Sequence, residues 1–142
     1  MRLSPIFMMV KQRYRGSSKH HTNNFIPMAF TEFELKRWEV ELDRFIEHRR
    51  PPLHIRAQLD FGYRIDGQSV MIFEIRPDWQ DPTVKREFPV AKATHVRTKD
   101  EWRVFWMRAD LKWHGYEPNL SVASLEEFLQ VVDDDAYCCF FG

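Results

Sequence analysis

Residues 53–76 read LHIRAQLDFGYRIDGQSVMIFEIR and set the kind of fold to expect. Apolar side chains occupy every odd position from Leu53 to Ile65, and polar or small residues occupy the even positions. This alternation predicts a β-strand with one buried face, because successive side chains of a strand point to opposite faces. The dipeptide Asp66-Gly67 that follows is typical of two-residue hairpin turns. Ser69 to Arg76 is therefore predicted to return as a second, antiparallel strand.

Three more strands are predicted downstream. Pro77 to Pro82 is predicted to be a loop, and Val84 to Arg97 the third strand. Pro89 inside this strand has no N–H for the ladder, so we expect a sheet edge or a β-bulge there. Alternating residues from Trp102 to Arg108 predict the fourth strand, and Leu111 to Tyr116 the fifth.

Two amphipathic helices flank the strands. The sequence TEFE at residues 31–34 fits a capping box, and apolar residues then recur at helical spacing until about His48. The sequence SLEE at residues 124–127 repeats the box ahead of a short helix to Val132. Three acids, Asp133 to Asp135, stand where the helix dipole disfavours negative charge, so we expect a solvated helix end there.

The expected fold class is α+β, an antiparallel meander of four to five strands with the N-terminal helix and the short C-terminal helix packed on one face. The apolar segment Tyr137 to Phe141 is predicted to dock as a last strand; completing a partner's sheet in a homodimer is the alternative. The chain has 142 residues, 44% of them hydrophobic, which suits a single domain over residues 28–142. Residues 1–27 hold five basic side chains and no acid, and we expect a disordered basic arm there. Met28 as the native start is the alternative.

Several classes of protein and site are excluded by composition and spacing. No apolar run approaches the ~20 residues of a transmembrane helix, so no membrane partner is expected. The two cysteines are adjacent, at Cys138 and Cys139, which excludes a disulfide framework and suits a cytoplasmic location. No two of the six histidines have zinc-ligand spacing, and the five glycines are scattered singly. We expect no metal or cofactor.

The first candidate binding site is a run of polar and aromatic residues across the predicted fourth and fifth strands. Its members are Trp106, Arg108, Asp110, Lys112, Trp113 and His114. On one face of the sheet, the two basic side chains would bind an anion, Asp110 would orient one of them, and an indole would offer a stacking surface. The simpler interpretation is a set of solvent-exposed charges worth ~0–1 kcal/mol as an ion pair. Trp79, in the loop between prolines, is the tryptophan we expect to be exposed for a partner.

The second candidate site joins Asp60 and Glu74 with Arg76 and Lys92. Two carboxylates on hairpin partners, with a basic residue nearby, are typical of hydrolases in which carboxylates hold Mg²⁺ and a lysine helps position water. Counting from the turn makes Asp60 and Glu74 near cross-strand neighbours, and adjacent carboxylates need a cation or an opposite charge. The alternative, which we favour, is structural ion pairing with the arginines of the same strands.

Several segments together resemble a known family. The carriers are Arg50 to Asp60, the run Phe73 to Pro77, Pro89 to Thr94, the tryptophan-rich block WRVFWMRADLKWHGY at residues 102–116, and the ending YCCFFG. They are similar to the bacterial domain-of-unknown-function family numbered 3024 over about residues 30–142. The resemblance implies a small bacterial cytoplasmic domain and supplies no activity, substrate or catalytic residue.

Two hypotheses of function follow from the residues. The favoured one is a non-enzymatic module that binds a protein or a nucleic acid through the polar sheet face and the Trp79 loop. A nucleic acid would require a continuous basic face, against an excess of five acids over residues 28–142. The alternative is a metal-dependent phosphodiesterase or nuclease-like hydrolase that uses Asp60 and Glu74.

Overall fold

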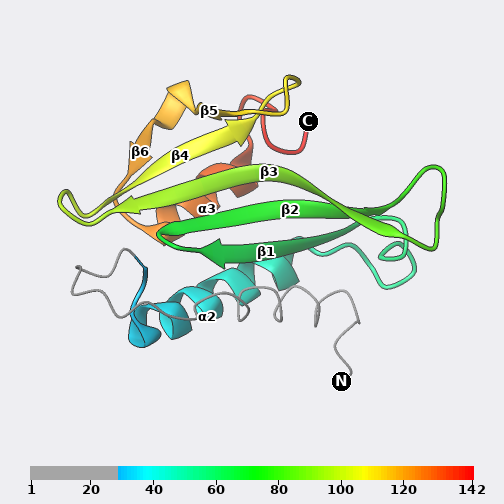
Figure 1. The fold of residues 1–142 in the computed structure, drawn as a ribbon, viewed down its shortest axis with the longest axis horizontal. Coiled ribbons are helices and arrows are strands. Elements are labelled where there is room, and N and C mark those ends of the chain that lie inside the picture. The colour runs from blue at the N-terminus through cyan, green and yellow to red at the C-terminus, as the bar shows by residue number, and fades with distance from the viewer. Residues whose placement is uncertain (1–28) are drawn as a thin grey trace, which may run out of the picture.

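The computed structural model describes residues 29–142, and the predicted basic arm lies outside the described residues (Figure 1). The elements, in chain order, are α2 (Glu32–Arg49), β1 (Asp60–Asp66), β2 (Ser69–Pro77), β3 (Lys85–Val96), β4 (Glu101–Met107), β5 (Trp113–Gly115), the 3-10 turn η1 (Glu117–Asn119), β6 (Ser121–Val122) and α3 (Leu125–Asp134). Neither α2 nor α3 is long and apolar enough to cross a bilayer.

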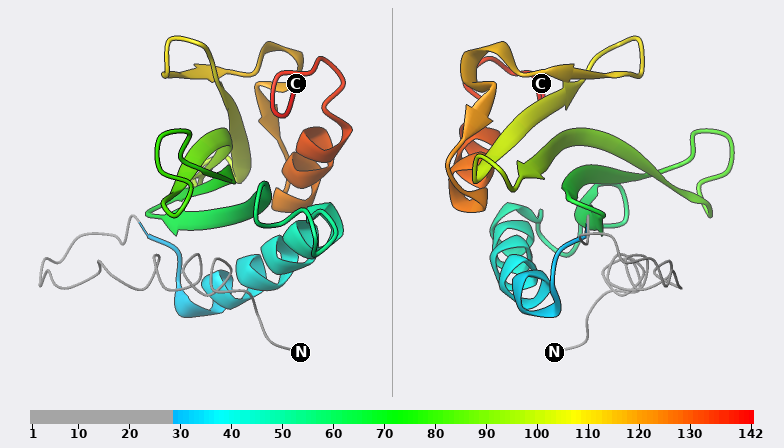
Figure 2. Two further views of the ribbon diagram at one scale, coloured as in Figure 1. Left: turned by 90° about the vertical axis from the view of Figure 1, so that its right-hand side faces the viewer. Right: turned by 60° about the vertical axis from the view of Figure 1, so that its left-hand side comes forward.

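The strands form an antiparallel sheet in the order β1-β2-β3-β4-β5, and β6 pairs with the beginning of β4, at Trp102 and Arg103. Both helices lie on the same face of this sheet, as Figures 1 and 2 show. The core between them buries large side chains from every layer, among them Leu42, Tyr63, Ile72 and Phe128. The predicted α+β meander is confirmed, and β6 is an addition that its two-residue length hid from sequence patterns.

The first strand begins at Asp60, seven residues later than the alternation predicted. If β1 continued backward in the same register, Gln58 would lie opposite Pro77, which has no N–H to donate. The segment before Asp60 instead forms tight turns, in which the amides of Ile55 and Gln58 donate to nearby carbonyl oxygens at 2.9 and 2.8 Å. The alternation over residues 53–59 was therefore a false signal for strand.

The predicted irregularity at Pro89 is a β-bulge. Ile72 pairs with Ala91 and Phe73 with Pro89, so Val90 is the extra residue of β3. From the bulge, the hairpin continues through the pairs Phe73–Pro89 to Pro77–Lys85 and ends at the loop that carries Trp79. A bulge bends and twists its strand. In chain order this bulge follows the loop that carries Trp79.

Both helices begin with the predicted side-chain caps. In α2 the Thr31 hydroxyl accepts from the Glu34 amide at 3.2 Å, and the Glu34 carboxylate accepts from the Thr31 amide at 3.0 Å. In α3 the Ser124 hydroxyl accepts from the Glu127 amide at 3.1 Å, while the Glu127 carboxylate reaches Ala123. The second box is therefore shifted by one residue from the predicted form.

The acidic end of α3 is bonded to protein groups, contrary to the solvated end that we predicted. Asp133 pairs with Arg49 at 3.2 Å. Asp135, in the left-handed conformation at φ 41°, accepts from the amides of Phe140 and Phe141 at 3.0 and 2.9 Å. These bonds fold the C-terminal segment back, so that the Phe140 ring lies 4.8 Å from that of Tyr116. The predicted docking is confirmed, but the segment is a series of turns and not a strand.

Candidate functional site

The β4–β5 turn holds most of the first predicted site in a fixed shape. The Asp110 carboxylate accepts from the Lys112 amide at 3.0 Å and lies 2.8 Å from Nε2 of His114. Both contacts, that with His114 first, hold the pKa of Asp110 below its usual range. Leu111 at the tip is 82% exposed and has a φ of 61°. The turn is therefore bonded within itself, and its most exposed side chain is apolar.

The first predicted site is divided between the two faces of the sheet. His114 pairs with Trp106 and Trp113 pairs with Met107, so His114 and Trp113 point to opposite faces. Trp113 lies on the face without helices, where the ammonium of Lys92 is 5.1 Å from its ring centre. The Arg108 guanidinium lies over the ring of Trp106, with its central carbon 5.4 Å from the ring centre. Of the two indoles predicted for stacking, Trp106 is therefore the one beside Arg108, and Trp113 lies on the other face.

The second predicted site is also split. Asp60 pairs with Ile75 and Phe61 pairs with Glu74, so the two carboxylates point to opposite faces. Asp60 is 1% exposed, and its two carboxylate oxygens accept from Nε and Nη2 of Arg50, at 2.9 and 2.7 Å. No group of three metal-ligating side chains occurs within residues 29–142. Structural ion pairing, the interpretation that we favoured, is what the register supports for Asp60.

Glu74 likewise has a structural partner. Its carboxylate pairs with the neighbouring Arg76 on the same face of β2. Lys92 lies farther along the sheet, opposite Met71, and its ammonium is 4.8 Å from the centre of the Phe105 ring. Burial lowers the pKa of Lys92. The four residues of the hydrolase hypothesis are therefore not gathered in one site. Asp60 pairs with Arg50, Glu74 pairs with Arg76, and Lys92 makes a cation-π contact with Phe105.

Trp79 lies on a loop whose shape is held by hydrogen bonds of the preceding residue, Asp78. The Trp79 side chain is 86% exposed, the most exposed of the large hydrophobic residues in the described chain. The preceding Asp78 is 8% exposed and accepts from Nε of Arg86 at 2.9 Å and from the Gln80 amide at 3.1 Å. The Asp78 amide in turn donates to the Val84 carbonyl at 2.8 Å. The exposure that the sequence predicted for Trp79 is confirmed, and the loop beneath it has a defined shape.

Two arginines stand at the base of this loop. Arg76 and Arg86 are direct cross-strand partners at the end of the β2–β3 hairpin. Like charges in this position repel, and the repulsion is offset because each guanidinium has its own carboxylate, Glu74 for Arg76 and Asp78 for Arg86. We call Trp79 with Arg76 and Arg86 the hairpin tip; it projects past the helices (Figure 2).

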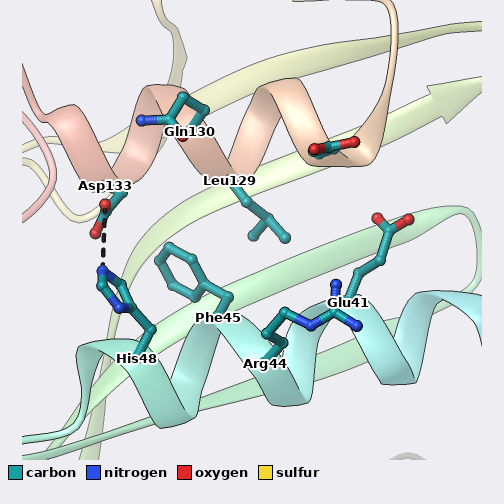
Figure 3. Close-up of a pocket in the computed structure, with 8 residues that line it drawn as sticks. Glu41, Arg44, Phe45, His48, Leu129, Gln130 and Asp133 are labelled. Atoms are coloured by element: carbon teal, nitrogen blue, oxygen red, sulfur yellow. Dashed lines mark ion pairs between the residues drawn. The ribbon is translucent and has the colours of Figure 1, made fainter.

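A groove of about 300 Å³ runs between the two helices (Figure 3). Phe45 of α2 and Leu129 of α3 form its floor, and His48 faces Asp133 at 3.8 Å across one end. The Glu41 side chain extends from α2 toward α3 at the other end. The groove joins none of the residues that the sequence singled out as candidates.

Residues 30–142 match the model of the family described as Domain of unknown function, DUF3024. The chain belongs to the DUF3024 family. The match spans nearly all of the described structure, and it confirms the resemblance that the tryptophan-rich block indicated. No curated protein and no solved structure matches the chain. Membership of DUF3024 assigns no activity, so function rests on the geometry of this DUF3024 domain.

Sequence reasoning missed the residues that support the candidate sites. Arg50 binds Asp60, and Asp78 with Arg86 braces Trp79. Arg50 was hidden because it follows a helix and precedes two prolines, a place with no periodic pattern. Asp78 directly after a strand and before Trp79 was a usable signal, since aspartates at turns bond backbone amides two residues on.

Proposed function

We propose that this DUF3024 domain is a non-enzymatic protein-binding module whose anchor is the hairpin tip. The observation that carries the proposal is the 86% exposure of Trp79 on a loop braced by a buried aspartate. A loop of defined shape loses little backbone entropy on binding, and Trp and Arg are the residue types enriched among the side chains that dominate protein interfaces. The partner should offer an apolar pocket for the indole, and its rim would meet two guanidinium groups that already hold carboxylates, those of Arg76 and Arg86.

A protein partner is favoured over a nucleic acid by the state of the basic residues. A nucleic-acid site needs a continuous face of available cations. In the part of the chain that the structure describes, Arg64, Arg76 and Arg86 each pair with a carboxylate. Arg56 donates to the Pro51 carbonyl. The helices add ten carboxylates against four Lys or Arg side chains, which would repel a polyanion.

The proposal is tested with the full chain as bait in lysate of its own cells, with and without nuclease. Trp79→Ala is compared with Leu111→Ala, which removes an equally exposed apolar side chain from the β4–β5 turn. Any retained protein is then purified, and its affinity for each variant is measured by calorimetry.

We expect a stoichiometric protein that survives nuclease and binds Trp79→Ala at least about 30-fold more weakly, since a central tryptophan is worth about 2 kcal/mol or more. Leu111→Ala should bind as the wild type does. Retention that nuclease abolishes would replace the protein partner with a nucleic acid. Equal binding by Trp79→Ala would remove the hairpin tip from the interface.

A further inference from the structure

A second cavity, of about 270 Å³, lies at the opposite end of α2 from the Arg50–Asp60 pair. It is enclosed by the first half of α2, the β3–β4 turn and the first turn of α3. Its walls include Trp38, Glu41, His95, Trp102 and Glu126. Trp102 is the centre of the aromatic part, with the ring of Trp38 at 5.3 Å and that of His95 at 4.9 Å.

Buried polar atoms without a hydrogen-bond partner gather at this cavity. Within residues 29–142 there are four such side-chain atoms, and three of them belong to cavity residues: Nε1 of Trp38, Oε2 of Glu41 and Nδ1 of His95. Trp38 is 9% exposed, and the His95 side chain 8%. Buried polar groups are nearly always paired because an unpaired one keeps its desolvation cost. Three of them around one cavity therefore indicate a polar occupant.

Two of these three atoms require a donor of hydrogen bonds, whereas Nε1 of Trp38 is itself a donor. Nε2 of His95 lies 3.1 Å from the Asp100 carboxylate, so the proton of a neutral imidazole belongs on Nε2, and Nδ1 is an acceptor. Oε2 of Glu41 is a second acceptor. Burial, the largest cause, and the carboxylate of Glu126 raise the pKa of Glu41, while Arg37 and Arg44 lower it. A positive charge in the cavity would offset both of the effects that raise it.

The charge around the cavity selects a cation. Among the lining residues there are four carboxylates and one guanidinium, that of Arg37. Glu34 is already paired with Arg97 at 2.9 Å. The other acids are Glu41, Asp100 and Glu126. The Arg37 guanidinium already lies over the Trp38 ring at 5.1 Å and 4.0 Å from Glu41. Its side chain is 65% exposed, so it can swing into solvent. The cavity thus presents acceptors to a guanidinium or ammonium group, and the indole of Trp38 is the aromatic surface, since the rings of Phe30 and His95 lie against Trp102.

We propose that this cavity binds a small organic cation, an alkylammonium or alkylguanidinium, between Glu41 and His95 and against the indole of Trp38. The N–H groups of the cation donate to Oε2 of Glu41 and Nδ1 of His95. The site is distinct from the hairpin tip and does not depend on the function proposed for it.

The test is a titration of the full chain with agmatine, which carries an ammonium and a guanidinium on one short chain. The readout is the indole N–H resonance of Trp38 in ¹H–¹⁵N spectra, assigned with Trp38→Phe. Acetate and 1-butanol are the control ligands, acetate because the N-terminus of α3 also meets the cavity and favours anions. Glu41→Gln and Glu126→Gln remove negative charge at the cavity. Glu47→Gln makes the same change on α2 outside it.

The proposal predicts a saturable shift of the Trp38 resonance with agmatine, at a Kd of about 1 mM or tighter, as the size of the ligand allows. Glu41→Gln should weaken binding about tenfold or more and Glu126→Gln about threefold, while Glu47→Gln stays within about twofold. A shift that does not saturate would overturn the proposal. So would wild-type affinity for agmatine in both Glu41→Gln and Glu126→Gln, or tighter binding of acetate than of agmatine. Dispersed spectra of Glu126→Gln keep the test valid if Glu41→Gln fails to fold.

Discussion

Asp60→Ala should destabilise the domain strongly, because Asp60 is the structural partner of a buried arginine. The Arg50 side chain is 3% exposed and that of Asp60 1%. Removing the carboxylate takes away the acceptor of Nε and Nη2 of this buried guanidinium, and Glu47, which binds Nη1, is 55% exposed. Breaking a buried pair in this way costs about 3–5 kcal/mol. The loss is a large part of the roughly 5–15 kcal/mol that a domain of this size has in total.

The assay is urea unfolding, followed by tryptophan fluorescence, at matched slope m. Asp110→Ala is the control, since it breaks an ion pair whose side chains are 35% and 47% exposed and should cost far less than Asp60→Ala. A double variant, Arg50→Met with Asp60→Leu, should regain at least half of the loss, because an apolar pair replaces the buried charges. A cost for Asp60→Ala as small as that of Asp110→Ala would refute the structural role and restore Asp60 as a candidate for chemistry.

Three further predictions concern the pH dependence, the β4–β5 turn and the C-terminal segment. The hydrogen bond from Arg97 lowers the pKa of Glu34 from 4.5 to about 2. The free energy of unfolding of the wild type should therefore exceed that of Glu34→Gln above pH 4.5, and the difference should disappear as the pH falls toward 2. Urea unfolding across that pH range measures it. Leu111→Gly should stabilise the domain by up to about 1 kcal/mol in thermal unfolding, because the φ of 61° strains a leucine; a loss of stability would show that the side chain packs. Phe140→Ala should cost about 3 kcal/mol, since the ring is 5% exposed against Tyr116, and should raise hydrogen exchange at the amides of 140 and 141; unchanged exchange would contradict the docking.

Most of the fold was predictable because local rules govern it. The caps at Thr31 and Ser124, the hairpin at Gly67 and the bulge at Pro89 each depend on a few neighbouring residues. The start of β1 was missed because it depends on Pro77, a partner 17 positions away from Asp60 in the sequence. Local pattern cannot report such a constraint.

The candidate sites were less predictable, since they depend on register and on distant contacts. One residue of register decides whether Asp60 and Glu74 share a face, and counting from the turn did not resolve it. The cation cavity joins Trp38, His95 and Trp102 from three elements, and in the sequence each has the signature of a core residue. The exposure of Trp79 was predicted because prolines and aspartates around one aromatic residue are a local signal.

Site-specific photo-crosslinking in living cells tests the proposed role of the hairpin tip most directly. A photoreactive phenylalanine analogue replaces Trp79 in one variant and Leu111 in the other, two positions of nearly equal exposure. We predict one discrete protein adduct from position 79 and none from position 111. The same adducts from both positions, or none from position 79 in cells where the domain is folded, would contradict a protein interface at the hairpin tip.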